Sequence, residues 1–134
     1  MVAEFRATHR HARITPRKAR RVIELIRGMP AGDALDTLGN DNHRASIFIR
    51  KVLASAVANA LQDETVRANR LVVSKAFINQ GPLLMGRQRF RPASMGRAAP
   101  YKRVTCHIHV HVADLGVEGR GAGARGAIRA EQES

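Results

Sequence analysis

Apolar and polar residues alternate without a break along Val104-Thr105-Cys106-His107-Ile108-His109-Val110-His111-Val112. Successive side chains of a β-strand point to opposite faces, so this pattern predicts a strand with one apolar and one polar face. The apolar face would carry Val104, Cys106, Ile108, Val110 and Val112, and the polar face Thr105, His107, His109 and His111. We expect the apolar face to lie on a hydrophobic core.

Two other segments are expected to pair with this strand. Residues 71–79 are rich in Val, Ile and Phe, and residues 4–14 show a weaker alternation. The connection between residues 79 and 104 is interrupted by Gly81, Pro82, Gly86, Pro92, Gly96 and Pro100. We expect it to have strand-like arms and to form a long β-hairpin at about residues 80–103.

A first helix is expected to begin at Thr15-Pro16, because Thr is a good N-cap and Pro suits the first helical position. Apolar residues recur at the helical spacing i, i+3, i+4 and i+7. They are Ala19, Val22, Ile23 and Ile26, and the opposite face carries Arg17, Arg20, Arg21 and Glu24. Gly28 is expected to end this helix, and a short second helix is expected at about residues 32–38.

The third helix, at about residues 42–62, is the longest that the sequence predicts. Apolar residues surround most of its circumference, namely Ile47, Phe48, Ile49, Val52, Leu53, Ala56, Val57, Ala60 and Leu61. A helix that is apolar on nearly all sides is typical of a central position in a core.

The predicted fold class is α+β, with three helices packed on a small three-stranded antiparallel sheet and a long protruding β-hairpin. Residues 1–114 are expected to form one domain, and the Gly- and Ala-rich residues 115–134 a flexible tail.

Positive charge is concentrated in two blocks of the sequence. Lys and Arg number 23 against 11 Asp and Glu, a formal net charge of +12. Residues 6–21 hold seven basic residues and residues 83–103 hold six, with no acid in either block. A polyanion would relieve this excess, and nucleic acid is the usual one.

No apolar run approaches the roughly 20 residues that span a bilayer. Residues 1–14 also lack a signal-peptide core. We therefore expect a cytoplasmic protein with no membrane partner.

The second block has a regular spacing in its extended segment. Arg87, Arg89 and Arg91 alternate with Gln88 and Phe90. Side chains two apart in an extended chain share a face at a separation of roughly 6.6 Å. A row of guanidinium groups suits bidentate contacts to phosphates, and Phe90 could stack on an unpaired base. A solvated loop is the alternative for the free protein, and we expect ordering against RNA.

The three histidines of the last strand raise the question of a metal. Imidazole is a common zinc ligand, but His107, His109 and His111 would project roughly in parallel, and no carboxylate or cysteine has ligand-like spacing to them. We therefore expect histidines that face solvent or RNA, with no metal and no cofactor.

Cys106, the single cysteine, falls on the apolar face and is expected to be a buried thiol. No catalytic or nucleotide-binding motif is present, and this predicts a protein that is not an enzyme.

Three stretches in order resemble one known family. The first is Arg10-His11-Ala12-Arg13-Ile14-Thr15-Pro16-Arg17-Lys18-Ala19-Arg20, followed by Leu25-Ile26-Arg27-Gly28. The second is Lys51-Val52-Leu53-Ala54-Ser55-Ala56-Val57-Ala58-Asn59-Ala60. The third comprises Gly81-Pro82, Pro92, Gly96-Arg97-Ala98, Lys102-Arg103 and His107-Ile108. Over about residues 3–113 the chain resembles bacterial ribosomal protein twenty-two of the large subunit.

The resemblance implies a structural constituent of the large ribosomal subunit. Such a protein would bind large-subunit ribosomal RNA, contact neighbouring ribosomal proteins and assist assembly. Its hairpin would line the nascent-peptide exit tunnel near the macrolide site and meet the nascent polypeptide. By position, the tunnel-lining tip would comprise Leu83, Leu84, Met85, Gly86, Arg87, Gln88, Arg89, Phe90 and Arg91.

From both lines of reasoning, the residues expected to bind RNA are Arg10, Arg13, Arg17, Lys18, Arg20, Arg21, Arg87, Arg89, Arg91, Arg97, Lys102 and Arg103. Two other functions remain open at this point. A free nucleic-acid-binding regulator of the nucleoid type would bind generic duplex DNA as well as ribosomal RNA. A metalloenzyme built on the three histidines would carry stoichiometric metal.

Overall fold

The fold, obtained as a computed structural model that describes residues 3–114, combines helices with antiparallel strands. Its elements are β1 (Glu4–Ala12), α1 (Pro16–Ile26), α2 (Ala31–Asn40), α3 (Arg44–Leu61), β2 (Leu71–Leu83), β3 (Arg89–Pro92), β4 (Ala98–Tyr101) and β5 (Val104–Asp114), with one-turn helices η1 (Ala68–Arg70), η2 (Leu84–Gly86) and η3 (Ser94–Gly96). Strands β1, β5 and β2 form one antiparallel sheet in that order, and β3 pairs with β4. The predicted fold class is confirmed. The predicted tail at 115–134 lies outside the described residues.

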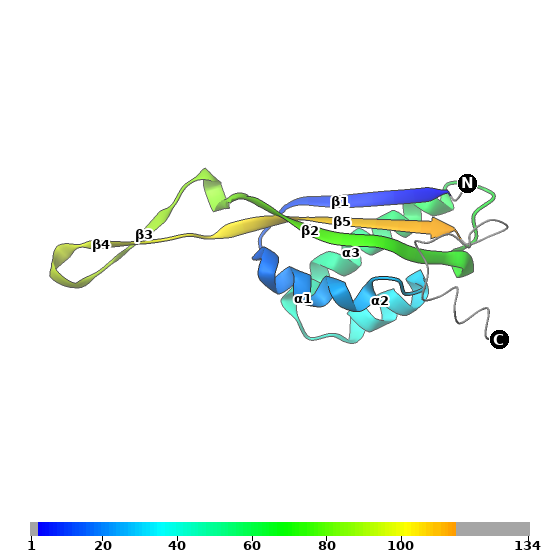
Figure 1. The fold of residues 1–134 in the computed structure, drawn as a ribbon, viewed down its shortest axis with the longest axis horizontal. Helices are drawn as coiled ribbons and strands as arrows, with labels where there is room; N and C mark the ends of the chain where they lie inside the picture. Colours follow the sequence, from blue (N-terminus) through cyan, green and yellow to red (C-terminus); the bar gives the residue numbers. More distant parts are fainter. Residues whose placement is uncertain (1–2, 115–134) are drawn as a thin grey trace.

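The helices lie together on one face of the sheet, with β5 in its centre (Figure 1). The apolar side chains Cys106, Ile108, Val110 and Val112 of β5 are fully buried. Alternation therefore predicted the strand and its buried face from Cys106 to Val112. At the start of the strand the prediction was wrong: Val104 is only partly buried, and Thr105, expected on the polar face, is buried, with its hydroxyl donating to the Pro82 carbonyl.

Helix α1 begins and ends where its sequence predicted. Pro16 is its first residue and Thr15 its N-cap, although the Thr15 side chain makes no capping hydrogen bond. All four residues of the predicted apolar face are fully buried. Gly28 follows the helix with φ +83°, a conformation that glycine adopts readily, and its N–H donates to the carbonyl of Val73 at 3.1 Å. That hydrogen bond joins the end of α1 to β2.

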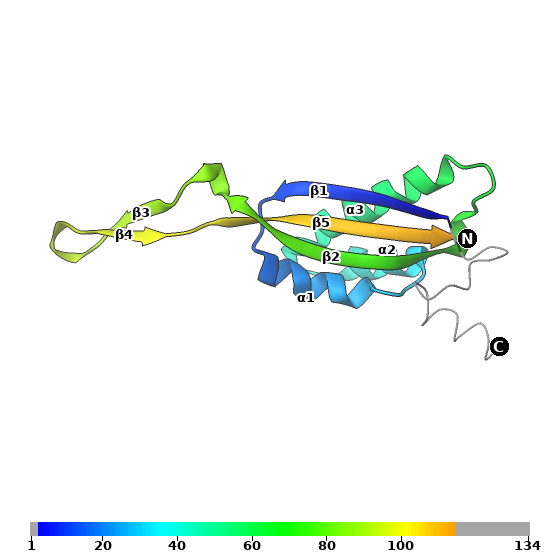
Figure 2. The ribbon, with the colours of Figure 1, turned by 45° about the horizontal axis from the view of Figure 1, so that its top comes forward.

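Helix α3 is less enclosed than its sequence predicted. Ile49, Leu53 and Ala56 are fully buried on the side that faces the sheet and α1, but Ile47 is 59% exposed and Leu61 46% exposed. The prediction of a central helix is therefore wrong. The helix lies in an outer layer, so only the side that meets the sheet and the other helices is covered (Figure 2).

Two regions differ in their surroundings, and we call them the body (residues 3–83 and 104–114) and the arm (residues 84–103). The arm leaves the body along the long direction of the sheet (Figure 1). At the junction, a Cβ on Gly81 would lie 2.6 Å from Oγ1 of Thr105, so any larger residue would force Thr105 or the backbone to shift. The Thr105 hydroxyl donates to the carbonyl of Pro82 at 2.7 Å. This close approach fixes the base of the arm.

The tip of the arm lies further along the chain than predicted. Strands β3 and β4 are joined by residues 93–97, where the N–H of Ala93 donates to the carbonyl of Arg97 at 2.8 Å. The chain reverses at Met95-Gly96, both with positive φ. Met85-Gly86 also has positive φ, but there the N–H of Leu84 still donates to the carbonyl of Arg103 at 2.7 Å.

The first Met-Gly pair therefore bends the arm without reversing it. The predicted tip residues Leu83, Leu84, Met85, Gly86, Arg87, Gln88, Arg89, Phe90 and Arg91 run instead from the end of β2 into β3. Their position at the tip is corrected, because two similar turns follow each other and only the second closes the hairpin.

Candidate nucleic-acid interface

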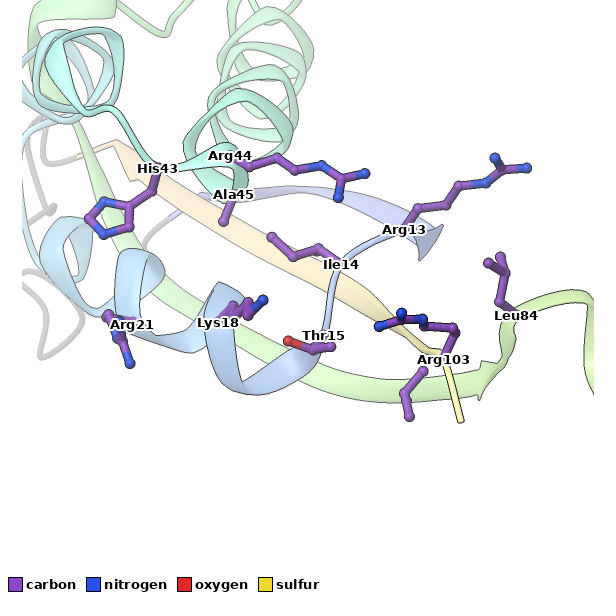
Figure 3. Close-up of a pocket in the computed structure, with 11 residues that line it drawn as sticks. Arg13, Ile14, Thr15, Lys18, Arg21, His43, Arg44, Ala45, Leu84 and Arg103 are labelled. Carbon is purple, nitrogen blue, oxygen red and sulfur yellow. The ribbon is translucent and has the colours of Figure 1, made fainter. Parts of the chain in front are cut away.

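A cleft of about 580 Å³ opens where the start of α1, the start of α3 and the base of the arm meet (Figure 3). It is lined by Arg13, Ile14, Thr15, Lys18, Arg21, His43, Arg44, Ala45, Leu84, Arg103 and Val104. Five of these residues are Lys or Arg, and none is Asp or Glu. Cations gathered in a concave site raise the local concentration of anions. The cleft is suited to phosphate groups.

The tertiary structure brings residues of the first basic block together with the last residue of the second in this cleft. Arg13 follows β1, and Lys18 and Arg21 lie on α1. Arg103, from the second block, links β4 to β5 and lines the same cleft. These side chains project from separate elements around the cleft (Figure 3). Residues from two blocks that are separate in the sequence therefore share one concave surface.

The sequence-based prediction missed His43 and Arg44, which lie outside both basic blocks. Arg44 is the first residue of α3 and His43 is its N-cap, so backbone N–H groups of the helix start lie beside the cleft. A helix N-terminus favours negative charge. The expected helix start near residue 42, followed by Arg44, was the only sign in the sequence of a cationic helix start. Nothing in the sequence indicates that this helix start lies beside Arg13, some thirty positions earlier.

Asp41 holds the start of α3 in place behind the cleft. Its carboxylate accepts a hydrogen bond from the Ser46 hydroxyl at 2.6 Å and lies 2.6 Å from Nδ1 of His43. These contacts, Ser46 first and His43 second, lower the pKa of Asp41 from its ordinary value of 3.8 to about 2. The carboxylate therefore orders His43 without lining the cleft itself.

The other predicted RNA-binding residues of the first block lie outside the cleft. Arg20 donates from Nη2 to the carbonyl of Ile78 at 3.2 Å, which attaches α1 to β2. Arg17 is exposed on α1, and Arg10 is exposed on β1. Residues of the first block therefore have three different places. Some line the cleft, Arg20 holds α1 to β2, and Arg10 and Arg17 lie on other exposed surfaces.

On the arm, Arg89 and Arg91 share a strand face as the alternation predicted, whereas Arg87 precedes β3. The guanidinium of Arg91 lies 4.4 Å from the centroid of the Tyr101 ring, and that of Arg103 lies 5.3 Å from it. Tyr101 was not among the predicted site residues. Its contacts are cation–π interactions that hold cations along the arm.

A hollow of about 610 Å³ lies on the same arm. It is lined by Met85, Arg87, Gln88, Arg89, Phe90 and Tyr101. Phe90 is 62% exposed, so its ring is open to a stacking partner. Arg97 lies in the tip turn, and Lys102 is exposed just beyond β4.

The three histidines of β5 contact different neighbours. The Nδ1 atom of His107 accepts the N–H of His11 at 3.1 Å, and Nδ1 of His111 lies 3.5 Å from the Glu4 carboxylate. His109 stacks on Phe77 with ring centroids 4.7 Å apart. Within residues 3–114, no group of three His, Cys, Asp or Glu side chains could hold a metal ion. The metalloenzyme alternative has no site there.

Comparison with known proteins identifies the family. The model of the family described as ribosomal protein L22p/L17e matches residues 7–113. The chain belongs to this family. The L22p/L17e match covers the whole arm and the body except residues 3–6 and 114, and it includes the cleft.

Relatives from three bacteria carry the name large ribosomal subunit protein uL22. The one from Solibacter usitatus is 44% identical over 83% of this chain and 96% of its own length. The one from Trichodesmium erythraeum is 46% identical over 84% of this chain and 92% of its own length. The one from Acidothermus cellulolyticus is 47% identical over 83% of this chain, but the match spans 40% of that longer protein. Among the residues that the structure describes, no helix is long and apolar enough to cross a membrane.

Proposed function

We propose that this L22p/L17e family member binds large-subunit ribosomal RNA through the basic cleft and the arm. Family membership makes the chain a structural constituent of the large subunit rather than an enzyme, placed in the cytoplasmic ribosome. The observation that carries the RNA proposal is the cleft, which is lined by four Lys and Arg side chains from the two basic blocks and by Arg44, without a lining carboxylate. That arrangement fits a folded polyanion.

The mechanism is neutralisation of phosphates with release of counterions. Arg13, Arg44 and Arg103 can each present paired N–H donors to phosphate oxygens. They are attached to the body at separate points, so one RNA strand that enters the cleft would contact α3 and the base of the arm together. Such cross-element contacts would support assembly of the subunit, and neighbouring ribosomal proteins would adjoin the body.

The arm is proposed to line the nascent-peptide exit tunnel near the macrolide site. Its length and its exposed residues 91–100 support this, because a segment with almost no buried side chains is ordered more readily by surrounding RNA. Since the chain reverses at Met95-Gly96, residues 93–97, rather than 83–91, would reach furthest along the tunnel and meet the nascent polypeptide.

The RNA proposal is tested by the salt dependence of binding to a large-subunit RNA fragment. The wild type should lose about 10³- to 10⁵-fold in affinity between 50 and 200 mM salt if about ten phosphates are neutralised. Replacing Arg13, Arg44 and Arg103 with Ala should reduce the slope of log K against log salt by about 2.7, since each phosphate contributes about 0.9.

The matched control replaces Arg50, Lys51 and Arg67 with Ala, which removes the same charge at exposed positions outside the cleft. If both triple variants lost the same affinity, net charge alone would account for binding and the cleft proposal would be wrong. Equal affinity for generic duplex DNA would favour a nucleoid-type regulator instead. Sedimentation with the large subunit after a moderate salt wash distinguishes a ribosomal constituent from that alternative.

The tunnel proposal is tested with a photo-reactive probe on a Met95→Cys variant in ribosomes that carry a stalled nascent chain. Cys106 is the only native cysteine, and it is buried with its pKa raised by that burial, so labelling would be selective. Crosslinks to the nascent chain are expected from position 95 and not from an Ile47→Cys control on α3. Equal crosslinking from both positions would contradict the proposal.

A further inference from the structure

The face of the sheet opposite the helices carries rings that lie side by side across the strands. The register places Thr8 of β1, His109 of β5 and Phe77 of β2 in one row. The Phe77 ring is stacked on His109, with centroids 4.7 Å apart and an interplanar angle of 15°, and it lies 5.9 Å from His111. In residues 3–114, no helix covers this face (Figure 2). Phe77, 37% exposed, is accessible from outside.

Basic side chains border these rings. Arg6 of β1 and Lys75 of β2 both pair with His111 in the register of the sheet. Arg10 lies close enough to His107 and His109 to affect their titration. The acid in this neighbourhood is Glu4, which contacts His111 and accepts a hydrogen bond from Ser74 at 2.8 Å. The border of the face is therefore mainly cationic.

The central imidazoles of this face favour their neutral form. Burial lowers the pKa of His107, and His11 and Arg10 lower it further. Burial also lowers the pKa of His109, as do His107, His111 and Arg10. A neutral imidazole offers one donor and one acceptor. It can also stack on another ring without the desolvation of a charge.

We propose that this sheet face is a second RNA site, which takes unpaired bases on Phe77 and His109 and their phosphates on Arg6, Arg10 and Lys75. The inference rests on the proposed RNA-binding function but extends it, since this site contacts bases whereas the cleft contacts backbone. Aromatic side chains on an open sheet are an established platform for single-stranded RNA. The cationic border favours a polyanion over a protein, whose contact surface would meet three like charges.

The test measures binding of the full chain to a fluorescent single-stranded oligoadenylate at fixed salt. Phe77→Ala is expected to weaken binding at least about fivefold, because base–aromatic stacking contributes about 1–3 kcal/mol per base. Phe77→Leu, which keeps the apolar volume but removes the ring, should weaken binding similarly. Ile47→Ala, on the exposed side of α3, is the matched control and should bind as the wild type does. Thermal unfolding checks that each variant is folded.

A second measurement locates the bases. In NMR spectra, the ring protons of Phe77 and His109 should shift upfield on addition of the oligonucleotide, because a stacked base adds its ring current. Unchanged ring shifts, together with wild-type affinity of both Phe77 variants, would overturn the inference. Wild-type RNA affinity of Phe77→Ala with weaker incorporation into subunits would also overturn it, since a protein neighbour would then cover the face.

The two proposals can fail separately. If the triple cleft variant loses affinity for the ribosomal RNA fragment while the Phe77 variants bind oligoadenylate normally, only the sheet-face inference fails. If the wild type binds neither RNA with a steep salt dependence, the proposed function itself fails.

Discussion

The body and the arm of this chain are stabilised in different ways, although both have extended strands. In the body, β5 buries Ile108, Val110 and Val112 completely and packs against α3 and α1. In the arm, β3 and β4 pair with each other, and residues 91–100 are all exposed. A two-stranded ribbon without a covered face is marginal in water. We therefore expect the body to fold alone and the arm to depend on its surroundings for order.

The largest expected effect is on the free energy of unfolding, when one side chain is truncated in the body and one in the arm. Ile108→Ala should lower the free energy of unfolding by about 2–5 kcal/mol, because it leaves a cavity in the core. Phe90→Ala on the arm should change it by less than about 0.5 kcal/mol, as surface substitutions do. Urea denaturation of both variants measures the difference. A large loss from Phe90→Ala would mean that the arm packs on the body.

The junction between the regions gives the next effect. Gly81→Ala should destabilise the free protein by about 1–3 kcal/mol, because overpacking forces the backbone to move. The added Cβ would lie 2.6 Å from Oγ1 of Thr105. Gly32→Ala is the control, since a Cβ in α2 meets nothing within 4 Å and Ala favours a helix by about 0.5–1 kcal/mol. Equal thermal stability of the two variants would show that the junction is not closely packed.

Acid titration should act on the body alone, because residues 84–103 contain no Asp, Glu or His. The pKa of Asp41 in the folded protein, about 2, lies below its ordinary value of 3.8. The ionised form therefore stabilises the fold above about pH 4, and this contribution is lost as the pH falls toward 2. Asp41→Asn should flatten the decline of unfolding free energy over this range, as measured by urea denaturation at several pH values. An unchanged decline would show that the hydrogen bonds from Ser46 and His43 do not persist.

The smallest effect on folding is expected from the arm cations. Replacing Arg87, Arg89 and Arg91 with Ala should leave the stability of the free protein within about 0.5 kcal/mol of the wild type. The same variant should bind ribosomal RNA less tightly, with a salt slope reduced by up to about 2.7. Calorimetry and binding titrations measure the two properties separately. If thermal stability collapsed, the arm would be part of the core.

Local pattern in the sequence was sufficient for the elements of the body. The alternation in Val104–Val112 predicted β5 and its buried face from Cys106 onward, and the helical spacing of four apolar residues predicted α1. Such patterns succeed because side-chain direction follows from backbone periodicity alone. The same reasoning placed basic residues in two blocks and an exposed arm between β2 and β5.

The number of apolar residues in a segment did not predict its burial, because burial depends on which elements pack around it. Helix α3 is rich in such residues, yet Ile47 and Leu61 are exposed because no described layer lies beyond them. The tip of the arm was placed too early because it was inferred by position from the family resemblance, and the sequence itself offers two similar turns, at Met85-Gly86 and Met95-Gly96. The pairing of β3 with β4 and the hydrogen bond from the Ala93 N–H to the Arg97 carbonyl identify Met95-Gly96 as the turn that reverses the chain.

The sequence by itself determined the strands, the helices, the cationic character of the chain and its family resemblance, since these depend on residue type and local spacing. Only the tertiary structure decided that Arg13, Arg44 and Arg103 share one cleft, and that Phe77 stacks on His109 across two strands. Those arrangements depend on how distant segments pack and on the register of strands far apart in the chain. The spacing of residue types within one segment carries no information about either.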